Sequence, residues 1–138
     1  FLGDGSATEA VDVMQHAWTG AWPQNRSPRI RSLMLAGGKA DDDVVLKKGG
    51  RYPAQLLARD PDGDVLSYRW AVMRESDATQ VGGDREQVPG MESGLIDDEG
   101  GGSIRMTAPG QAGAYRLFVY VYDGEGHAGH ANLPFLVE

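Results

Sequence analysis

The sequence predicts an all-β sandwich of about seven strands, preceded by a short N-terminal helix. From residue 29 onward, apolar residues recur with a period of two, as expected for strands that bury one face. The chain of 138 residues also contains 20 glycines and 7 prolines. So many turn-forming residues favour many short elements over a few long helices.

Composition narrows the possible classes of function. The net charge of −7, with Lys47–Lys48 as the one basic pair, argues against a nucleic-acid binder. The absence of cysteine excludes disulfides, thiolate metal sites and cysteine nucleophiles. No apolar run approaches the ~18 residues of a membrane span. Because the chain begins at Phe1 and not at methionine, we expect a fragment whose targeting signal lies upstream. We also expect the module to be a monomer.

Residues 1–28 are predicted to form a helix and a linker, which could be the tail of a preceding domain. Ser6 and Glu9 fit a capping box, in which both side chains satisfy free amides at the start of a helix. We expect the helix over residues 7–18, and residues 22–28 as an extended linker.

The predicted helix has an apolar stripe that needs a surface to cover. Its members recur at helical spacing and are Val11, Met14 and Trp18. Gly20 is a plausible end of the helix, because glycine readily adopts the left-handed conformation found there.

The sandwich itself is predicted over residues 29–138. Strand-like stretches are found at 30–35, 44–46, 52–59, 66–73, 103–107, 114–122 and 128–137. Residues 77–102, which are rich in Gly and Asp, are expected to be mostly loop. Trp70 alternates in phase with Leu66 and Tyr68, so we expect it in the core between the two sheets.

Two blocks of sequence resemble a known family. Residues 60–70 (DPDGDVLSYRW) resemble the B–C corner and C strand of PKD-like and cadherin-like bacterial modules, and residues 113–124 (GAYRLFVYVYDG) look like their F strand and the turn after it. The resemblance covers roughly residues 29–138 and implies an immunoglobulin-like β-sandwich. Such modules serve as spacers, calcium-stiffened linkers or glycan binders, so the resemblance leaves the function open among these.

The N-terminal segment carries a second resemblance. Residues 9–15, with Trp18–Gly20 and Trp22–Pro23, look like the tail of a glycoside-hydrolase catalytic barrel that leads into a C-terminal module. This resemblance implies an accessory domain of a bacterial carbohydrate-active enzyme, attached to a neighbouring catalytic domain. The parent protein would be secreted, periplasmic or on the cell surface.

An acidic corner is the candidate metal site. Asp60, Asp62 and Asp64 alternate around a Pro–Gly turn, and Asp123 with Glu125 follows a strand that ends on the same side of a sandwich. Ca²⁺ prefers six to eight hard oxygen ligands, which alternating aspartates can supply in part. The alternative is turn chemistry alone, in which the Asp side chains accept hydrogen bonds from nearby amides. The sequence leaves both open.

A row of aromatic residues on strand 114–122 is the candidate sugar site. Tyr115 is placed like a tyrosine-corner residue and is expected to point inward. The side chains that then point outward are Arg116, Phe118, Tyr120 and Tyr122. Pyranose C–H faces stack on such rings, while neighbouring polar groups bond the hydroxyls. Flanking polar groups are expected from Arg69, His130 and Asn132.

The same aromatic row could instead be buried against protein. The N-terminal helix could cover it, or it could pack against a missing catalytic domain. Trp18 and Trp22 are further candidates for sugar contact, although they too could pack on the sandwich.

The sequence thus favours a non-catalytic module that binds polysaccharide for an attached glycoside hydrolase. It contains no nucleophile elbow, phosphate loop or helical HExxH motif, so we do not expect an enzyme. The alternative is a structural spacer, with or without bound Ca²⁺, that binds no glycan.

Overall fold

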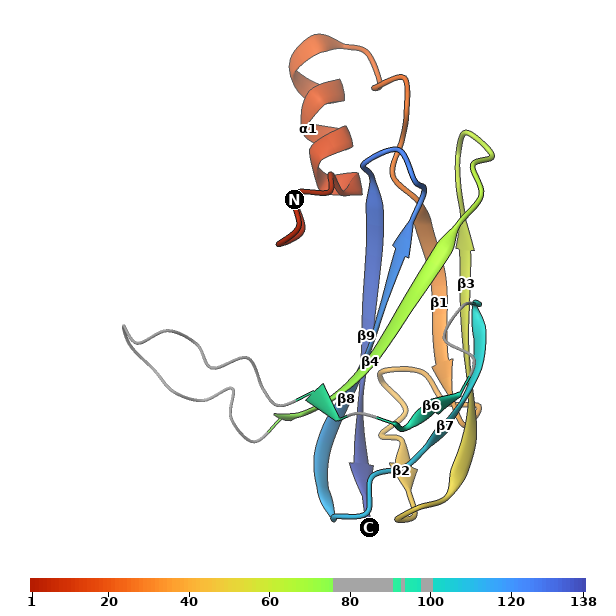
Figure 1. Ribbon diagram of the computed structural model, residues 1–138. Helices are drawn as coiled ribbons and strands as arrows, with labels where there is room; N and C mark the ends of the chain where they lie inside the picture. Colours follow the sequence, from red (N-terminus) through yellow and green to blue (C-terminus); the bar gives the residue numbers. More distant parts are fainter. Residues whose placement is uncertain (76–90, 93, 98–100) are drawn as a thin grey trace.

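The computed structural model describes residues 1–75, 91–92, 94–97 and 101–138. Two β-sheets face each other, and one helix stands at their end (Figure 1). The elements are α1 (Glu9–Thr19), β1 (Arg29–Leu35), β2 (Val45–Leu46), β3 (Arg51–Arg59), β4 (Ser67–Arg74), β5 (Met91–Glu92), β6 (Ile96–Asp97), β7 (Ser103–Thr107), β8 (Gly113–Tyr122) and β9 (Ala128–Val137). The predicted all-β sandwich with an N-terminal helix is therefore confirmed.

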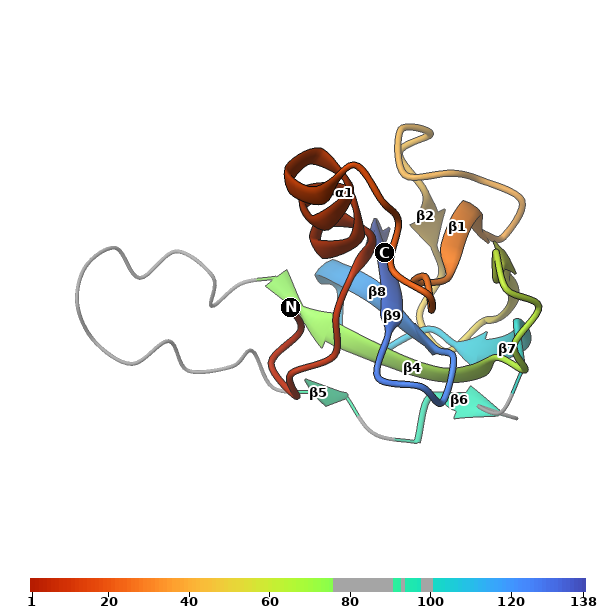
Figure 2. The ribbon, with the colours of Figure 1, turned by 90° about the horizontal axis from the view of Figure 1, so that it is seen from above.

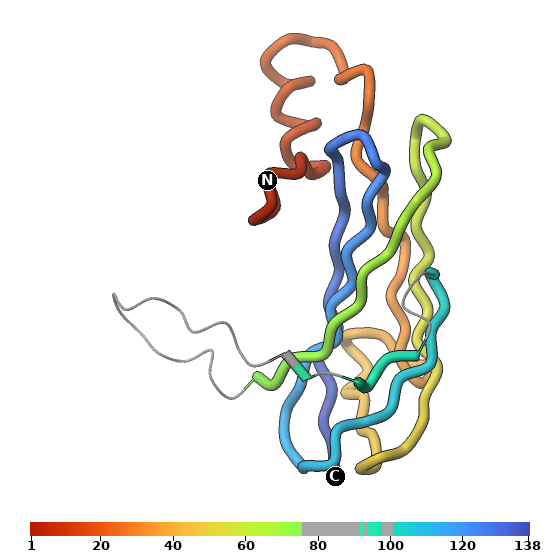
Figure 3. The backbone as a smooth tube through the Cα atoms, in the orientation of Figure 1, coloured from red at the N-terminus to blue at the C-terminus, as the bar shows by residue number. Residues whose placement is uncertain are grey.

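The strands form two sheets. One has the order β1-β3-β7-β6 and is called here the β3 sheet; the other has the order β2-β9-β8-β4-β5 and is called the β8 sheet. Pairing is antiparallel except between β2 and β9, which run parallel. The chain passes from one sheet to the other at several connections, among them β3 to β4 and β7 to β8, as the tube in Figure 3 shows. Such crossings are typical of Greek-key sandwiches.

The stretch predicted to be loop is not loop throughout. Residues 91–92 pair with β4, and residues 96–97 pair with β7. Strands of two residues are too short to show an alternating apolar pattern in the sequence. They form by pairing with a longer neighbouring strand, which depends on tertiary context. Of the stretch predicted as mostly loop, residues 77–90, 93 and 98–100 lie outside the described residues.

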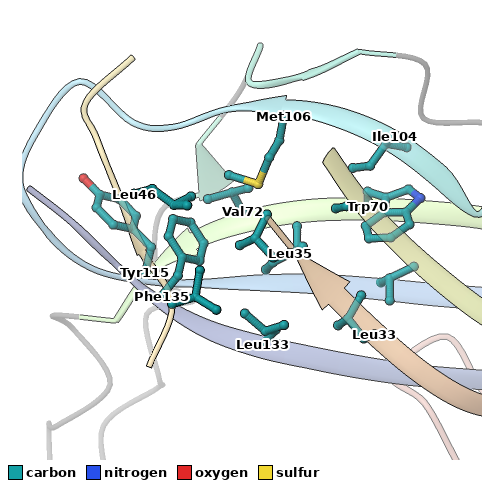
Figure 4. Packing of buried hydrophobic residues seen from close by; sticks show 14 of the residues in the cluster. Leu33, Leu35, Leu46, Trp70, Val72, Ile104, Met106, Tyr115, Leu133 and Phe135 are labelled. Atoms are coloured by element: carbon teal, nitrogen blue, oxygen red, sulfur yellow. The ribbon is translucent and has the colours of Figure 1, made fainter. Parts of the chain in front are cut away.

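Strand β8 alternates between core and surface along its whole length. Its inward side chains, Tyr115, Leu117, Val119 and Val121, are almost completely buried. Trp70 from β4 is also buried, and its indole N–H donates to the Gly101 carbonyl oxygen at 2.8 Å. Both expectations for the core are thus confirmed, and Figure 4 shows Trp70 and Tyr115 among the buried side chains packed between the sheets.

A tyrosine corner fixes the start of β8. The Tyr115 hydroxyl donates to the Gln111 carbonyl oxygen at 2.9 Å and accepts from the Arg74 guanidinium, also at 2.9 Å. The Tyr115 ring stacks on Phe135 of β9, with the ring centres 5.7 Å apart. One buried side chain therefore ties the loop before β8 to both neighbouring strands.

The predicted capping box is wrong. Thr8 occupies the N-cap position of α1 without a side-chain hydrogen bond. The Ser6 amide donates to the Asp4 carboxylate at 2.9 Å, and Glu9 forms an ion pair with Arg29 at 3.1 Å. Both predicted partners are therefore engaged elsewhere. The predicted end is confirmed, since Gly20 adopts the left-handed conformation with φ of 73° and donates to the His16 carbonyl oxygen.

The apolar stripe of α1 does not cover a surface as expected. Met14 and Trp18 are 48% and 78% exposed. The helix instead buries Asp12, whose carboxylate accepts the Ser27 amide at 2.6 Å and lies 3.3 Å from Nδ1 of His127. Polar contacts with the linker and the β8–β9 turn therefore hold α1 at the end of the sandwich. Within the described ranges, no helix is long and apolar enough to cross a membrane.

Removing the Tyr115 hydroxyl tests the contribution of the tyrosine corner to stability. Tyr115→Phe leaves the Gln111 carbonyl without its donor, so we expect the free energy of unfolding to fall by about 1–2 kcal/mol. Tyr120→Phe, on the half-exposed face of the same strand, is the matched control and should change it by less than about 0.5 kcal/mol. Urea denaturation followed by fluorescence measures both. Equal losses of unfolding free energy in the two variants would show that the hydrogen bonds of the Tyr115 hydroxyl do not stabilise the fold.

Candidate functional site

Three carboxylates meet at the end of the sandwich beside α1. Asp60 and Asp64 lie in the turn between β3 and β4, and Asp123 begins the turn between β8 and β9. Both turns are at the same end of the molecule (Figure 1). One oxygen from each of the three carboxylates lies within 4.8 Å of the others. The structure thus brings together three of the four residues predicted as metal ligands.

Asp60 has one satisfied and one unsatisfied oxygen. The residue is 7% exposed. Its Oδ1 accepts the backbone amides of Asp62 at 2.8 Å and Asp64 at 3.2 Å, which is the geometry of an Asx turn. Its Oδ2 is buried and has no hydrogen-bond partner in the described part of the chain. A buried, unpaired carboxylate oxygen is costly, so turn chemistry accounts for only half of this side chain.

Asp123 is buried, but both of its carboxylate oxygens accept hydrogen bonds. Its Oδ1 accepts the amides of Glu125 at 2.7 Å and His127 at 3.1 Å, and its Oδ2 accepts Nδ2 of Asn25 at 2.6 Å. Burial by itself would raise the pKa of Asp123, but these hydrogen bonds outweigh it and hold the pKa below its ordinary value. Asp123 therefore remains negatively charged at neutral pH.

Asp64 faces the accumulated negative charge of the corner. Loss of hydration and then the charges of Asp60 and Asp123 raise the pKa of its carboxyl above the ordinary value. A raised pKa means that the ionised form is disfavoured there. A cation placed among the three carboxylates would remove that repulsion. The donor set consists entirely of hard oxygens, which suits Ca²⁺ better than a softer transition metal.

The remaining acidic residues of the corner play a different part. Asp62 is exposed, and its Oδ2 accepts the Arg26 amide at 2.6 Å. Neither Asp62 nor the exposed Glu125 belongs to the group of three found among the described residues. Asn25 was not expected at all, because 98 positions separate it from Asp123 and nothing in the linker sequence signals the contact.

The aromatic row lies on the outer face of the β8 sheet, where the alternation places it. Phe118, Tyr120 and Tyr122 are each half-buried. Arg69 of β4 and His130 of β9 stand opposite Tyr120 on its two sides, and Asn132 stands opposite Phe118. The structure thus groups these aromatic and polar side chains on one surface.

A surface hollow of about 560 Å³ follows this row. Its lining residues are Leu2, Gly3, Asp4, Arg69, Ala71, Met73, Phe118, Tyr120, Tyr122, His130 and Asn132. No described residue of α1 is among them, so the helix does not cover the row. The first residues of the chain border it instead, and Figure 2 shows the N-terminus beside β4.

Two groups on this surface have shifted pKa values. Burial and the nearby charge of Asp4 raise the pKa of the Tyr122 hydroxyl, which therefore stays protonated as a donor. Hydrogen bonds from Ser6 lower the pKa of Asp4. The Tyr122 phenol and the Asp4 carboxylate interact with each other, and the carboxylate keeps further acceptor capacity that a sugar hydroxyl could use.

The other predicted sugar contacts do not line the hollow. Arg116 is engaged in an ion pair with Glu75 and a hydrogen bond to Asn132. Trp18 is 78% exposed on α1. Trp22 is 41% exposed, stacks on His16 with the ring centres 4.2 Å apart, and has the Arg26 guanidinium 4.0 Å from its ring centre. None of these three predicted residues is among the side chains that line the hollow.

Comparison with known proteins supports the fold. No family model matches the chain, and no curated protein matches it. The chain is similar in structure to a nucleoside hydrolase-related hypothetical protein from Saccharophagus degradans that is associated with carbohydrate metabolism. The TM-score is 0.51 with 18% sequence identity, and the match covers 83% of this chain and 26% of that protein. At this identity the likeness is one of fold, and this chain spans about a quarter of the longer protein's length.

Proposed function

We propose that this chain is a non-catalytic carbohydrate-binding module that holds a polysaccharide against the outer face of the β8 sheet. The observation that carries the proposal is the row of Phe118, Tyr120 and Tyr122, half-exposed along a surface hollow. A solvated antiparallel strand normally presents polar side chains on such a face. Rings in line at the strand spacing instead offer apolar faces on which successive pyranose units can stack.

The polar groups beside the rings complete the recognition surface. Arg69 and His130 lie on the strands that flank Tyr120, so their side chains reach the same hollow from both sides. Guanidinium, imidazole and phenol groups can donate to sugar oxygens, and the Asp4 carboxylate can accept from sugar hydroxyls. A few convergent polar groups around an apolar floor are the usual composition of a small-molecule site.

The biological role would be to bring an attached enzyme to its substrate. A tethered glycoside hydrolase gains effective concentration when its accessory module binds the same polymer. The similarity to a longer protein associated with carbohydrate metabolism supports this setting. We extend the proposal to a bacterial parent protein that is secreted, periplasmic or on the cell surface, and in which this module itself performs no bond cleavage.

Loss of one central ring tests the sugar site. Tyr120→Ala removes a stacking surface worth about 1.4 kcal/mol, so we expect the Kd for the bound polysaccharide to rise about tenfold. Calorimetry and affinity electrophoresis on a panel of plant, algal and fungal glucans measure it. Leu57→Ala is the control, because Leu57 is 51% exposed on β3 of the opposite sheet. Failure of the folded wild-type module to bind any glycan would overturn the proposal.

A cation-stiffened spacer is the second candidate function. The observation that favours it is Oδ2 of Asp60, which is buried without a hydrogen-bond partner in the described ranges and belongs to a group of three carboxylates. We propose that Ca²⁺ occupies this corner, with Asp60, Asp64 and Asp123 as ligands. Bound there, the ion would supply charge compensation and a rigid link between the β3–β4 and β8–β9 turns.

Removal of one charge distinguishes a metal site from a turn. In Asp60→Asn, the amide oxygen can keep the two backbone hydrogen bonds while the amide nitrogen donates to the neighbouring carboxylates. We therefore expect the metal-free variant to be more stable than the wild type by about 1 kcal/mol, which raises Tm by roughly 4 °C. Calcium at about 100 times its Kd should stabilise the wild type by about 2.7 kcal/mol and the variant not at all.

Melting curves in EDTA and in Ca²⁺ measure both effects. Asp41→Asn is the control, because Asp41 is exposed and the substitution removes the same charge. A wild-type Tm that is indifferent to EDTA and to added Ca²⁺, with Asp60→Asn less stable than the wild type, would show that the corner is a hydrogen-bonded turn alone.

A further inference from the structure

The linker between α1 and β1 is bound to the acidic corner by two consecutive residues. Nδ2 of Asn25 donates to Oδ2 of Asp123 at 2.6 Å. The Arg26 amide donates to Oδ2 of Asp62, also at 2.6 Å. The two acceptors belong to different turns, β8–β9 and β3–β4 respectively. The acidic corner is therefore bordered by the linker as well as by the β3–β4 and β8–β9 turns.

The position of Asn25 matters because three carboxylates do not complete a calcium site. Ca²⁺ takes six to eight oxygens, and side-chain amide oxygens are among its usual ligands. The Asn25 side chain is half-buried and in direct contact with an oxygen of Asp123. Without an ion, the amide nitrogen is the correct group to face that carboxylate.

A bound cation reverses this preference. An N–H donor beside a cation is repelled, whereas the amide oxygen is attracted. Rotation of the amide by half a turn exchanges the two atoms at almost no steric cost, because nitrogen and oxygen differ little in size. Asn25 can therefore act as a hydrogen-bond donor in the empty corner and as an oxygen ligand in the occupied one.

We propose, as an inference that rests on the proposed calcium site, that Asn25 is a further ligand and that the ion joins the N-terminal linker to both turns of the sandwich. The ion then fixes the segment that carries α1. Without it, one neutral amide contact and one backbone amide hold the same linker to the corner.

The neighbouring contacts show why the linker controls the helix. The Ser27 amide donates to the buried carboxylate of Asp12 in α1 at 2.6 Å. Ala7, just before α1, accepts from the Ala128 amide at 2.8 Å and donates to the Gly126 carbonyl oxygen at 2.9 Å. The helix is thus attached at its start to the β8–β9 turn and through Asp12 to the linker. An ion that holds Asn25 strengthens the second attachment.

Substitutions at Asn25 test the inference on the whole chain, with CaCl₂ as the probe. Asn25→Ala removes the ligand, so we expect its Kd for Ca²⁺ to rise about tenfold, whereas Asn25→Asp supplies an oxygen and should bind at least as tightly as the wild type. Gln24→Ala, a neighbour in the same linker, is the control and should leave the Kd unchanged. Calorimetry measures all four proteins.

Hydrogen exchange adds a readout that reports on the linker itself. Calcium should slow exchange at the Arg26 and Ser27 amides about tenfold or more in the wild type, and not in saturated Asn25→Ala. In Asn25→Asp, the new charge repels Asp123, so the same amides should be protected in Ca²⁺ and exposed in EDTA.

The outcomes separate this inference from the site on which it rests. Equal calcium affinity of Asn25→Ala and wild type, with the same protection of the linker, would overturn the role of Asn25 and leave the three-carboxylate site intact. A wild-type chain that binds no Ca²⁺ would remove the site and this inference together. Both the three-carboxylate site and the role of Asn25 are supported if the wild type binds Ca²⁺ tightly, Asp60→Asn does not bind it, and Asn25→Ala binds it more weakly.

Discussion

The alternation of strand β8 between core and surface is the constraint on which the rest of the structure depends. This strand pairs with β4 on one side and with β9 along its whole length on the other. Its inward residues form the centre of the core, and its outward residues form the aromatic row. Because successive side chains in a strand point to opposite faces, burying Tyr115 also decides that Tyr120 and Tyr122 face outward. The same strand ends just before Asp123, which places one carboxylate at the acidic corner.

The two candidate sites differ in what they cost the fold. The aromatic row leaves apolar rings half-exposed, which loses some hydrophobic stabilisation without introducing strain. The acidic corner gathers like charges and buries an oxygen of Asp60 without a partner among the described residues. Proteins commonly retain such local costs where a ligand relieves them. In the functions proposed above, a cation would relieve the cost at the corner, and a polymer would cover the exposed rings of the row.

The attachment of α1 shows why local sequence rules mislead at the ends of a domain. The apolar spacing of Met14 and Trp18 predicts a buried face, yet both are exposed, and Asp12 is buried in their place. The carboxylate of Asp12 satisfies the Ser27 amide and approaches His127, so a polar network outweighs the available apolar contact. Similarly, Glu9 pairs with Arg29 and so is unavailable to cap its own helix. In both cases a partner distant in sequence competed successfully with a local one.

The sequence by itself determined what depends on neighbours along the chain. The period of two located the main strands, the Tyr115 and Trp70 positions of the core, and the outward row of Phe118, Tyr120 and Tyr122. The turn at Asp60 followed from its neighbours Pro61 and Gly63. Tertiary structure alone decided which distant groups meet: Asn25 with Asp123, Asp12 with His127, and the first residues of the chain beside the aromatic row. The physical reason is that backbone periodicity is a local property, whereas burial of charge and closure of a site depend on the packing of whole elements.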